Sequence, residues 1–205
     1  MKNLSALLLV LSLLLCACSG PAAPGASSNP APSAPASSTA SLPHLKHVVI
    51  TIRNYGEIKL ELDASAAPIT VENFIQLARQ GFYDGLTFHR IMDGFMIQGG
   101  APKSGSSAPP SIKGEFAANG VKNPILHKAG VISMARTNNP DSAASQFFIT
   151  VAAAHHLDGN YAAFGYVTEG LEIAQKIARD ARPVDNNGTI LPNQQPIIES
   201  IRVLD

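Results

Sequence analysis

The sequence predicts a mainly β domain in which many short strands accompany only two helices. Eight segments of four to seven residues are apolar or alternate between apolar and polar residues, and two longer segments have the period of an amphipathic helix. The loops between them are rich in Gly, Pro, Asn and Ser. This mix favours a β-barrel or sandwich over a parallel α/β sheet. Strands this short leave exposed edges unless the sheet closes, so a closed barrel is expected.

The first two strands are predicted to form a hairpin. Residues 47–53 are rich in Val and Ile, and residues 57–62 alternate Ile and Leu with Glu and Lys around a turn at 54–56. The segment 68–81 is expected to contain a helix, with Thr70 as its N-cap and Gly81 just past its end. Its apolar face is predicted to hold Val71, Phe74, Ile75 and Ala78.

The rest of the domain alternates short strands with loops and contains the second helix. That helix is expected over 171–179, where Leu171, Ala174 and Ile177 share one face. The remaining predicted strands are 87–91, 95–98, 130–134, 146–151, 162–167 and 197–203.

Residues 1–43 are expected to precede the fold. Lys2 and the mainly apolar run 4–15 are typical of a signal peptide and too short to span a bilayer comfortably. The small Ala17 suits cleavage before Cys18, so the segment resembles a lipoprotein signal peptide (1–17) with Cys18 as the lipid-modified first residue; the alternative is an ordinary secretory signal. Residues 18–43, nearly all Ala, Pro, Ser and Gly, predict a disordered tether.

The cysteines and the charges of the domain at 44–205 limit its function. The two cysteines are Cys16 and Cys18, so the mature domain can form no disulfide or thiolate site. Removing Lys2 from the 15 basic residues leaves 14 against 15 acidic ones, which favours neither nucleic acid nor an anionic membrane surface. The pairs His44/His47 and His155/His156 lack a third ligand, so no metal site is predicted.

Two stretches predict an apolar pocket that also holds a carbonyl group. Residues 88–100 and 145–149 combine Phe, Met and Ile with one arginine and two glutamines. Ser145 lacks the Gly-x-Ser-x-Gly context of a hydrolase nucleophile. Phe88, Phe147 and Ile149 alternate with the pocket residues, so we expect them in the core.

These motifs closely resemble those of the cyclophilin family of peptidyl-prolyl cis-trans isomerases. The resemblance covers nearly all of 47–204 and includes 67–74, 81–85, 88–100, 130–135, 145–149, 157–159 and 164–165. It implies an eight-stranded antiparallel barrel capped by two helices, with the substrate groove outside. It also implies rotation of X-Pro bonds without covalent chemistry or a cofactor. Together with the predicted lipoprotein signal, it leads us to expect Pro-containing proteins of the cell envelope as substrates.

The resemblance assigns roles residue by residue. It makes Arg90 the catalytic residue that stabilises the twisted amide. It places Phe95, Met96, Phe148 and Leu157 in the proline pocket, Gln98 and Gln146 among the polar contacts, and Ala135 and Arg136 along the substrate backbone.

Two pocket positions depart from the best-known members of the family. His156 stands where many eukaryotic members have a cyclosporin-binding Trp, and Tyr161 stands where they have a His. Weak cyclosporin binding is therefore expected. The rival hypothesis is a non-catalytic tethered chaperone that only holds Pro-containing segments. In both cases we expect a monomer anchored to the membrane only by lipid. Ser19 favours the outer membrane over the inner.

Overall fold

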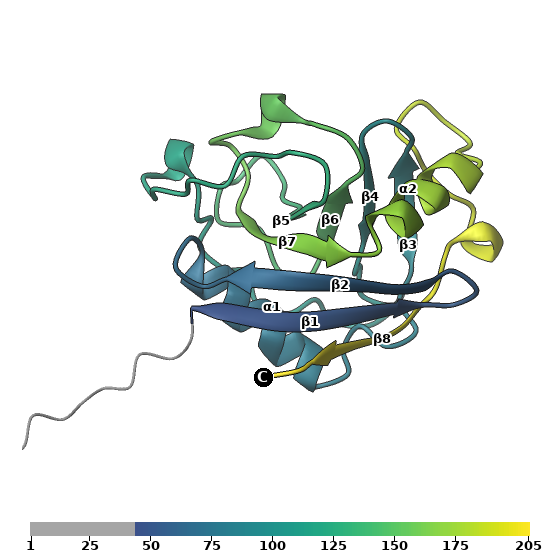
Figure 1. The fold of residues 1–205 in the computed structure, drawn as a ribbon, viewed down its shortest axis with the longest axis horizontal. Helices are drawn as coiled ribbons and strands as arrows, with labels where there is room; N and C mark the ends of the chain where they lie inside the picture. Colours follow the sequence, from purple (N-terminus) through teal and green to yellow (C-terminus); the bar gives the residue numbers. More distant parts are fainter. Residues whose placement is uncertain (1–43) are drawn as a thin grey trace, which may run out of the picture. The chain divides into compact units, whose positions relative to one another are not determined.

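Eight antiparallel strands form one curled sheet (Figure 1). The computed structural model describes residues 44–205, so the predicted signal peptide, Cys18 and the tether lie outside the described part. The strand order is β3-β4-β6-β5-β7-β2-β1-β8. The strands are β1 (Leu45–Ile52), β2 (Gly56–Asp63), β3 (Phe88–Met92), β4 (Met96–Gly99), β5 (Val131–Met134), β6 (Phe147–Thr150), β7 (Ala163–Glu169) and β8 (Ile198–Val203).

The edges of this sheet meet without forming a full ladder, which corrects the prediction of a closed barrel. The outer strands β3 and β8 approach through one isolated bridge, between Thr87 and Ile197. Next to it, the Phe88 N–H donates to the Pro196 carbonyl at 2.9 Å. Pro196 has no N–H to continue the ladder. Farther along, the edge of β3 pairs instead with a loop, through the bridge between Arg90 and Thr189.

Two helices pack against the sheet. Helix α1 (Pro68–Arg79) contacts β8 and β2, and α2 (Leu171–Asp180) contacts β2 and β4 (Figure 1). The loops contain three short 3-10 turns: η1 (Ala117–Asn119), η2 (His155–Leu157) and η3 (Pro192–Gln194).

The predicted N-cap of α1 is wrong, whereas its predicted C-terminal end at Gly81 is confirmed. The N-cap position is Ala67 rather than Thr70. Thr70 is buried in the first turn, where its N–H and its hydroxyl donate to Glu115 Oε2 at 2.8 and 2.7 Å. At the other end, Gly81 adopts φ +69° and the Phe82 N–H donates to the Leu77 carbonyl, which closes the helix as predicted.

An aromatic cluster forms the centre of the core and fixes which side chains face outward. Phe74 meets the Phe147 ring edge-on at 5.4 Å, and Tyr83 lies 5.1 Å from Phe74. The predicted core residues Phe88, Phe147 and Ile149 are fully buried. Because side chains alternate along a strand, Phe148 points to the opposite face of β6 from Phe147. By burying Phe147, the core fixes Phe148 on the outer face of β6, which is described below.

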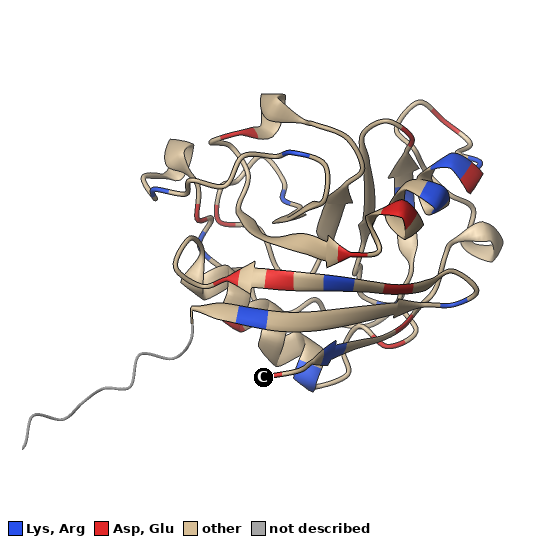
Figure 2. Cartoon of the chain, viewed as in Figure 1, with Lys and Arg blue, Asp and Glu red and all other residues tan. Residues whose placement is uncertain are grey.

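Charges of both signs are interspersed over the described residues. Figure 2 shows that β2 and α2 each carry both acidic and basic residues. In residues 44–205, no helix is long and apolar enough to cross a membrane. The same residues contain no group of three or more His, Cys, Asp or Glu side chains placed to hold a metal ion.

Candidate functional site

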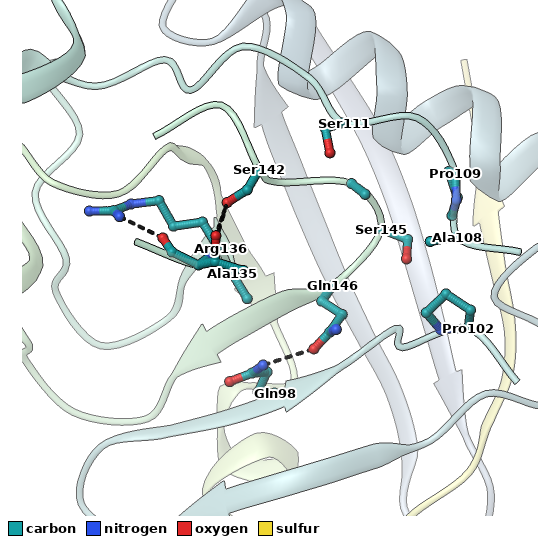
Figure 3. Close-up of a pocket in the computed structure, with 12 residues that line it drawn as sticks. Gln98, Pro102, Ala108, Pro109, Ser111, Ala135, Arg136, Ser142, Ser145 and Gln146 are labelled. Atoms are coloured by element: carbon teal, nitrogen blue, oxygen red, sulfur yellow. Dashed lines mark hydrogen bonds between the residues drawn. The ribbon is translucent and has the colours of Figure 1, made fainter. Parts of the chain in front are cut away.

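The structure brings the predicted site residues together around one groove. Its larger part is a cavity of about 360 Å³, and each residue that lines it is one that the sequence singled out: Arg90, Phe95, Met96, Gln98, Ala135, Arg136, Phe148, His156, Leu157 and Tyr161. Gln146 lines an adjoining cavity of about 280 Å³ (Figure 3). The two cavities share Gln98, Ala135 and Arg136, so they are neighbouring parts of one groove.

The floor of the larger cavity is an apolar cluster separate from the main core. Its buried members are Met96, Phe148, Ala154 and Leu157. Tyr161 meets the Phe148 ring edge-on at 6.0 Å. Phe95, which packs against this cluster, lies 5.3 Å from His156 between ring centres. A small apolar ring would find hydrophobic contacts on several sides here.

Arg90 is held at the rim of this cavity by two strong hydrogen bonds. Its Nε donates to the Asn187 carbonyl at 2.7 Å, and its Nη1 donates to Gln98 Oε1 at 3.1 Å. The other contacts of the guanidinium are with sulfur: Nη2 lies 3.3 Å from Met92 Sδ and Nη1 lies 4.0 Å from Met96 Sδ. Because thioether sulfur is a weak acceptor, these donors can turn to a ligand at little cost.

Two glutamines connect Arg90 to the second cavity. Gln98 Nε2 donates to Gln146 Oε1 at 3.0 Å, and Figure 3 shows the two side chains pointing toward one another. The guanidinium therefore fixes which way the Gln98 amide faces, and Gln98 in turn orients Gln146. The Ala135 N–H already donates to the Gln146 carbonyl at 3.0 Å. A peptide that pairs with the backbone of Ala135 would therefore donate an N–H to the Ala135 carbonyl.

Arg136 lines both cavities, but most of its side chain is already engaged. Its guanidinium lies over the rings of Tyr161 and Phe116, 4.6 and 5.1 Å from their centroids. Its Nε and Nη1 donate to the carbonyls of Asn160 and Thr137 at 2.9 and 2.8 Å. Arg136 therefore holds Tyr161 in place, and its Nε and Nη1 are engaged by carbonyl groups of the protein.

His89 places a neutral ring next to Arg90. Its Nδ1 is buried and has no hydrogen-bond partner among residues 44–205. Burial, followed by the positive charge of Arg90, lowers the pKa of His89. The imidazole therefore stays uncharged at neutral pH and does not compete electrostatically with the guanidinium.

The sequence did not predict a buried hydrogen-bond network that lies beneath the groove. His127 is fully buried and stacks on Phe148 with 6.0 Å between ring centres. Its Nδ1 lies 2.9 Å from Asp158 Oδ1, and its Nε2 lies 3.1 Å from Ser133 Oγ. These contacts fit a neutral ring that donates to the carboxylate and accepts from the hydroxyl. The signal was undetectable in sequence because 31 residues separate His127 from Asp158.

Serine hydrolases use the same three residue types for catalysis, but the surroundings of this network differ from those of a hydrolase site. A nucleophilic serine must reach the substrate, whereas Ser133 is fully buried in β5. Asp158 also accepts from His155 Nδ1 at 2.9 Å. It lies between Leu157 and Tyr161, two residues that line the cavity. The network therefore supports the pocket from below.

The hydrogen bonds to Asp158 keep it ionised. Burial raises its pKa, but the backbone N–H of His127, the His127 ring and His155 outweigh this, and the pKa falls to about 2. Burial also lowers the pKa of His127 below its ordinary value of 6.5, and the carboxylate offsets this only in part.

The buried His127 is expected to make stability depend on pH. Below pH 6.5 the unfolded chain gains a proton at this histidine while the folded protein does not, so the free energy of unfolding falls as the pH falls. The slope is at most about 1.4 kcal/mol per pH unit for one histidine. Urea unfolding at pH 7.5 and 5.5 checks this, and His127→Gln should have a smaller pH difference than wild type. Equal differences would refute the assignment. A remaining slope is expected from His89, whose pKa is also lowered.

Comparisons with known proteins agree with this geometry. Residues 47–203 match the model of the family described as cyclophilin type peptidyl-prolyl cis-trans isomerase. Peptidyl-prolyl cis-trans isomerase A of Dickeya dadantii is 40% identical over 170 residues, covering 77% of this chain and 84% of that protein. Peptidyl-prolyl cis-trans isomerase B of Bacillus subtilis is 45% identical over 122 residues, covering 60% of this chain and 83% of the relative.

Solved structures show the same similarity. A cyclophilin-type isomerase of Cryptosporidium parvum superposes with a TM-score of 0.67 at 28% identity, covering 78% of this chain and 98% of that one. A second structure of that isomerase, determined in the presence of the dipeptide Ala-Pro, gives a TM-score of 0.66 at 29% identity, covering 78% and 99% of the two chains. The chain therefore belongs to the cyclophilin-type family, and its activity is that of a peptidyl-prolyl cis-trans isomerase.

Proposed function

We propose that the groove isomerises X-Pro bonds through Arg90, which stabilises the amide in its twisted state. Rotation about the bond must overcome about 18–20 kcal/mol of lost amide resonance. In the twisted state the nitrogen regains its lone pair and becomes an acceptor. The guanidinium is always charged and can donate to that nitrogen. Donation is stronger to the twisted amide than to the planar one, and this difference lowers the barrier.

The observation that carries the proposal is the geometry of Arg90. Two strong hydrogen bonds, to Asn187 and Gln98, fix the guanidinium, while its remaining contacts are weak acceptors. It lines the same cavity as the apolar floor built on Phe148 and Met96. The floor would hold the proline ring while the preceding carbonyl swings, and Arg90 would meet the nitrogen.

The free energy of one charge-assisted hydrogen bond accounts for only part of the acceleration, so Arg90 does not act alone. A hydrogen bond to a charged group contributes about 1.5–3 kcal/mol. At about 1.4 kcal/mol per tenfold in rate, Arg90 supplies roughly ten- to a hundredfold. The apolar floor would supply more, because it excludes the water that favours the planar, polar ground state.

The substrates proposed for this chain are Pro-containing segments of proteins and peptides. A related isomerase was crystallised in the presence of the dipeptide Ala-Pro, so this sequence is a suitable test peptide. The experiment is to add the domain to an Ala-Pro peptide and follow cis–trans exchange by NMR. Saturable acceleration at catalytic concentrations is expected. Binding without acceleration would instead favour the tethered chaperone that only holds such segments.

We also propose that the protein is a monomeric, lipid-anchored component of the cell envelope, and Ser19 favours the outer membrane over the inner. Support comes from the sequence alone: an apolar run at 4–15 is followed closely by Ala17 and Cys18. Lipid on Cys18 would leave the domain connected to the membrane through residues 19–43. The substrates would then be proteins on the envelope side of that membrane.

Metabolic labelling tests the anchor. Cells that express the full chain with radioactive palmitate are expected to label the wild type and not Cys18→Ala. Cys16→Ala is the matched control, because it lies within the predicted signal peptide and should leave labelling intact. Equal labelling of Cys18→Ala and the wild type, or no labelling of either, would contradict the anchor.

A further inference from the structure

The loop that follows α2 packs against the strand that carries Arg90. The Ile91 N–H donates to the Gly188 carbonyl at 2.8 Å, and the Ile190 N–H donates to the His89 carbonyl at 3.0 Å. Between these bonds, Arg90 Nε donates to the Asn187 carbonyl at 2.7 Å. The loop therefore takes the place of a neighbouring strand along the outer edge of β3, and it supplies one of the two strong acceptors of the guanidinium.

The carboxylate of Asp185 holds this loop in shape. Its Oδ1 accepts the N–H groups of Asn187 and Thr189, each at 3.0 Å. The backbone closes the same turn, because the Val184 N–H donates to the Thr189 carbonyl at 2.9 Å. The hydrogen bonds from Thr189, above all that from its backbone, lower the pKa of Asp185 and keep it charged. The carboxylate thus holds both neighbours of Gly188.

Gly188 brings the loop into direct contact with β3. It adopts φ +85°, and a Cβ atom at this position would lie 2.6 Å from both the Ile91 carbonyl oxygen and Met92 Cγ. A side chain would therefore push the loop away from β3. The absence of a side chain lets the Asn187 carbonyl reach the Arg90 guanidinium.

From these contacts we infer that Asp185 is a positioning residue for isomerisation. It shapes residues 185–189 so that the Asn187 carbonyl fixes Nε of Arg90 and the Nη groups face the substrate. The inference rests on the proposed role of Arg90. Among the salt bridges of residues 44–205, none joins Asp185 to Arg90. The carboxylate therefore acts through the loop rather than by pairing with the guanidinium.

The expected effect is on turnover rather than on substrate binding. Loss of one well-formed hydrogen bond corresponds to about a three- to tenfold change in rate. Asp185→Ala should therefore lower kcat by about three- to tenfold and leave KM within about twofold. Asp185→Asn keeps an oxygen acceptor for the two N–H groups and should recover much of the lost kcat. An unchanged kcat in Asp185→Ala would overturn the inference.

Asp180→Ala is the matched control for the loss of charge. Asp180 is also exposed and ends α2 just before the loop, but its carboxylate pairs with Lys176. It should leave kcat at the wild-type value. A fall in kcat equal to that of Asp185→Ala would show that surface charge alone matters and would overturn the inference.

A double-mutant cycle and an NMR signal separate this inference from the role of Arg90. In the Arg90→Ala background, Asp185→Ala should cause no further loss of kcat, and a full additional loss would overturn the inference. The Arg90 Nε–H resonance, assigned by its loss in Arg90→Lys, should shift and exchange faster with water in Asp185→Ala. If Arg90→Ala retained full activity, the proposed function would fail. An unchanged Nε–H resonance in Asp185→Ala would instead contradict the positioning role of Asp185 and leave the proposed role of Arg90 intact.

Discussion

Replacing Arg90 with alanine is expected to lower kcat/KM for an X-Pro peptide by about ten- to a hundredfold, almost entirely through kcat. The variant loses the donor that would meet the twisted nitrogen, while the apolar floor of Phe148, Met96 and Leu157 remains. Substrate binding should therefore change little. Peptide isomerisation assays at several substrate concentrations separate the two constants.

Two other arginine variants make this test specific. Arg90→Lys keeps the charge but cannot reproduce the two bonds that Arg90 makes to Asn187 and Gln98. It should remain several-fold slower than wild type. Arg136→Ala removes a cation from the same groove, but that guanidinium lies on Tyr161 and bonds to carbonyl groups. It should act mainly on KM. A larger loss of kcat in Arg136→Ala than in Arg90→Ala would contradict the assignment.

Replacing Glu115 with alanine is expected to destabilise the domain by about 3 kcal/mol. The buried carboxylate accepts the Ile69 N–H at 3.1 Å, the Thr70 N–H at 2.8 Å and the Thr70 hydroxyl at 2.7 Å. It also places negative charge at the positive end of α1. Alanine would leave the two Thr70 donors buried without an acceptor, and unpaired buried donors are costly.

Urea unfolding measures this effect. The chain has no Trp, so far-ultraviolet circular dichroism is the suitable signal. Glu115→Gln retains one acceptor oxygen and should lie between wild type and Glu115→Ala. Below the unfolding transition, Glu115→Ala should keep its kcat, because Glu115 lines neither cavity of the groove. A free energy of unfolding within 1 kcal/mol of wild type would contradict the capping role.

Local patterns predicted the elements of the fold well and their connections less well. Helix α2 was expected over 171–179 and runs Leu171–Asp180, because its apolar period is strong. The cap of α1 was misassigned, because the true acceptor is Glu115, 45 residues from Thr70. The sheet edges were expected to close fully. Pro196 and the loop at 188–190 prevent this, and neither effect shows in strand periodicity.

The candidate site was predicted through motifs and not through contacts. Residues 88–100 and 145–149 contain much of the groove, and the family resemblance supplied Ala135, His156 and Tyr161. What supports those residues was missed. Asn187 lies 97 residues from Arg90 and acts through its carbonyl, which any residue type can provide. His127 is one buried histidine without a local motif, and only the fold brings it under Phe148.

Exchange NMR on an Ala-Pro peptide tests the central claim most directly. Wild type and Arg90→Ala are compared at concentrations that bind the same fraction of peptide, so that the exchange rate reports catalysis and not affinity. The mechanism predicts rapid cis–trans exchange with wild type and exchange at least about tenfold slower with Arg90→Ala. Equal exchange rates with the two proteins at equal bound fraction would contradict it.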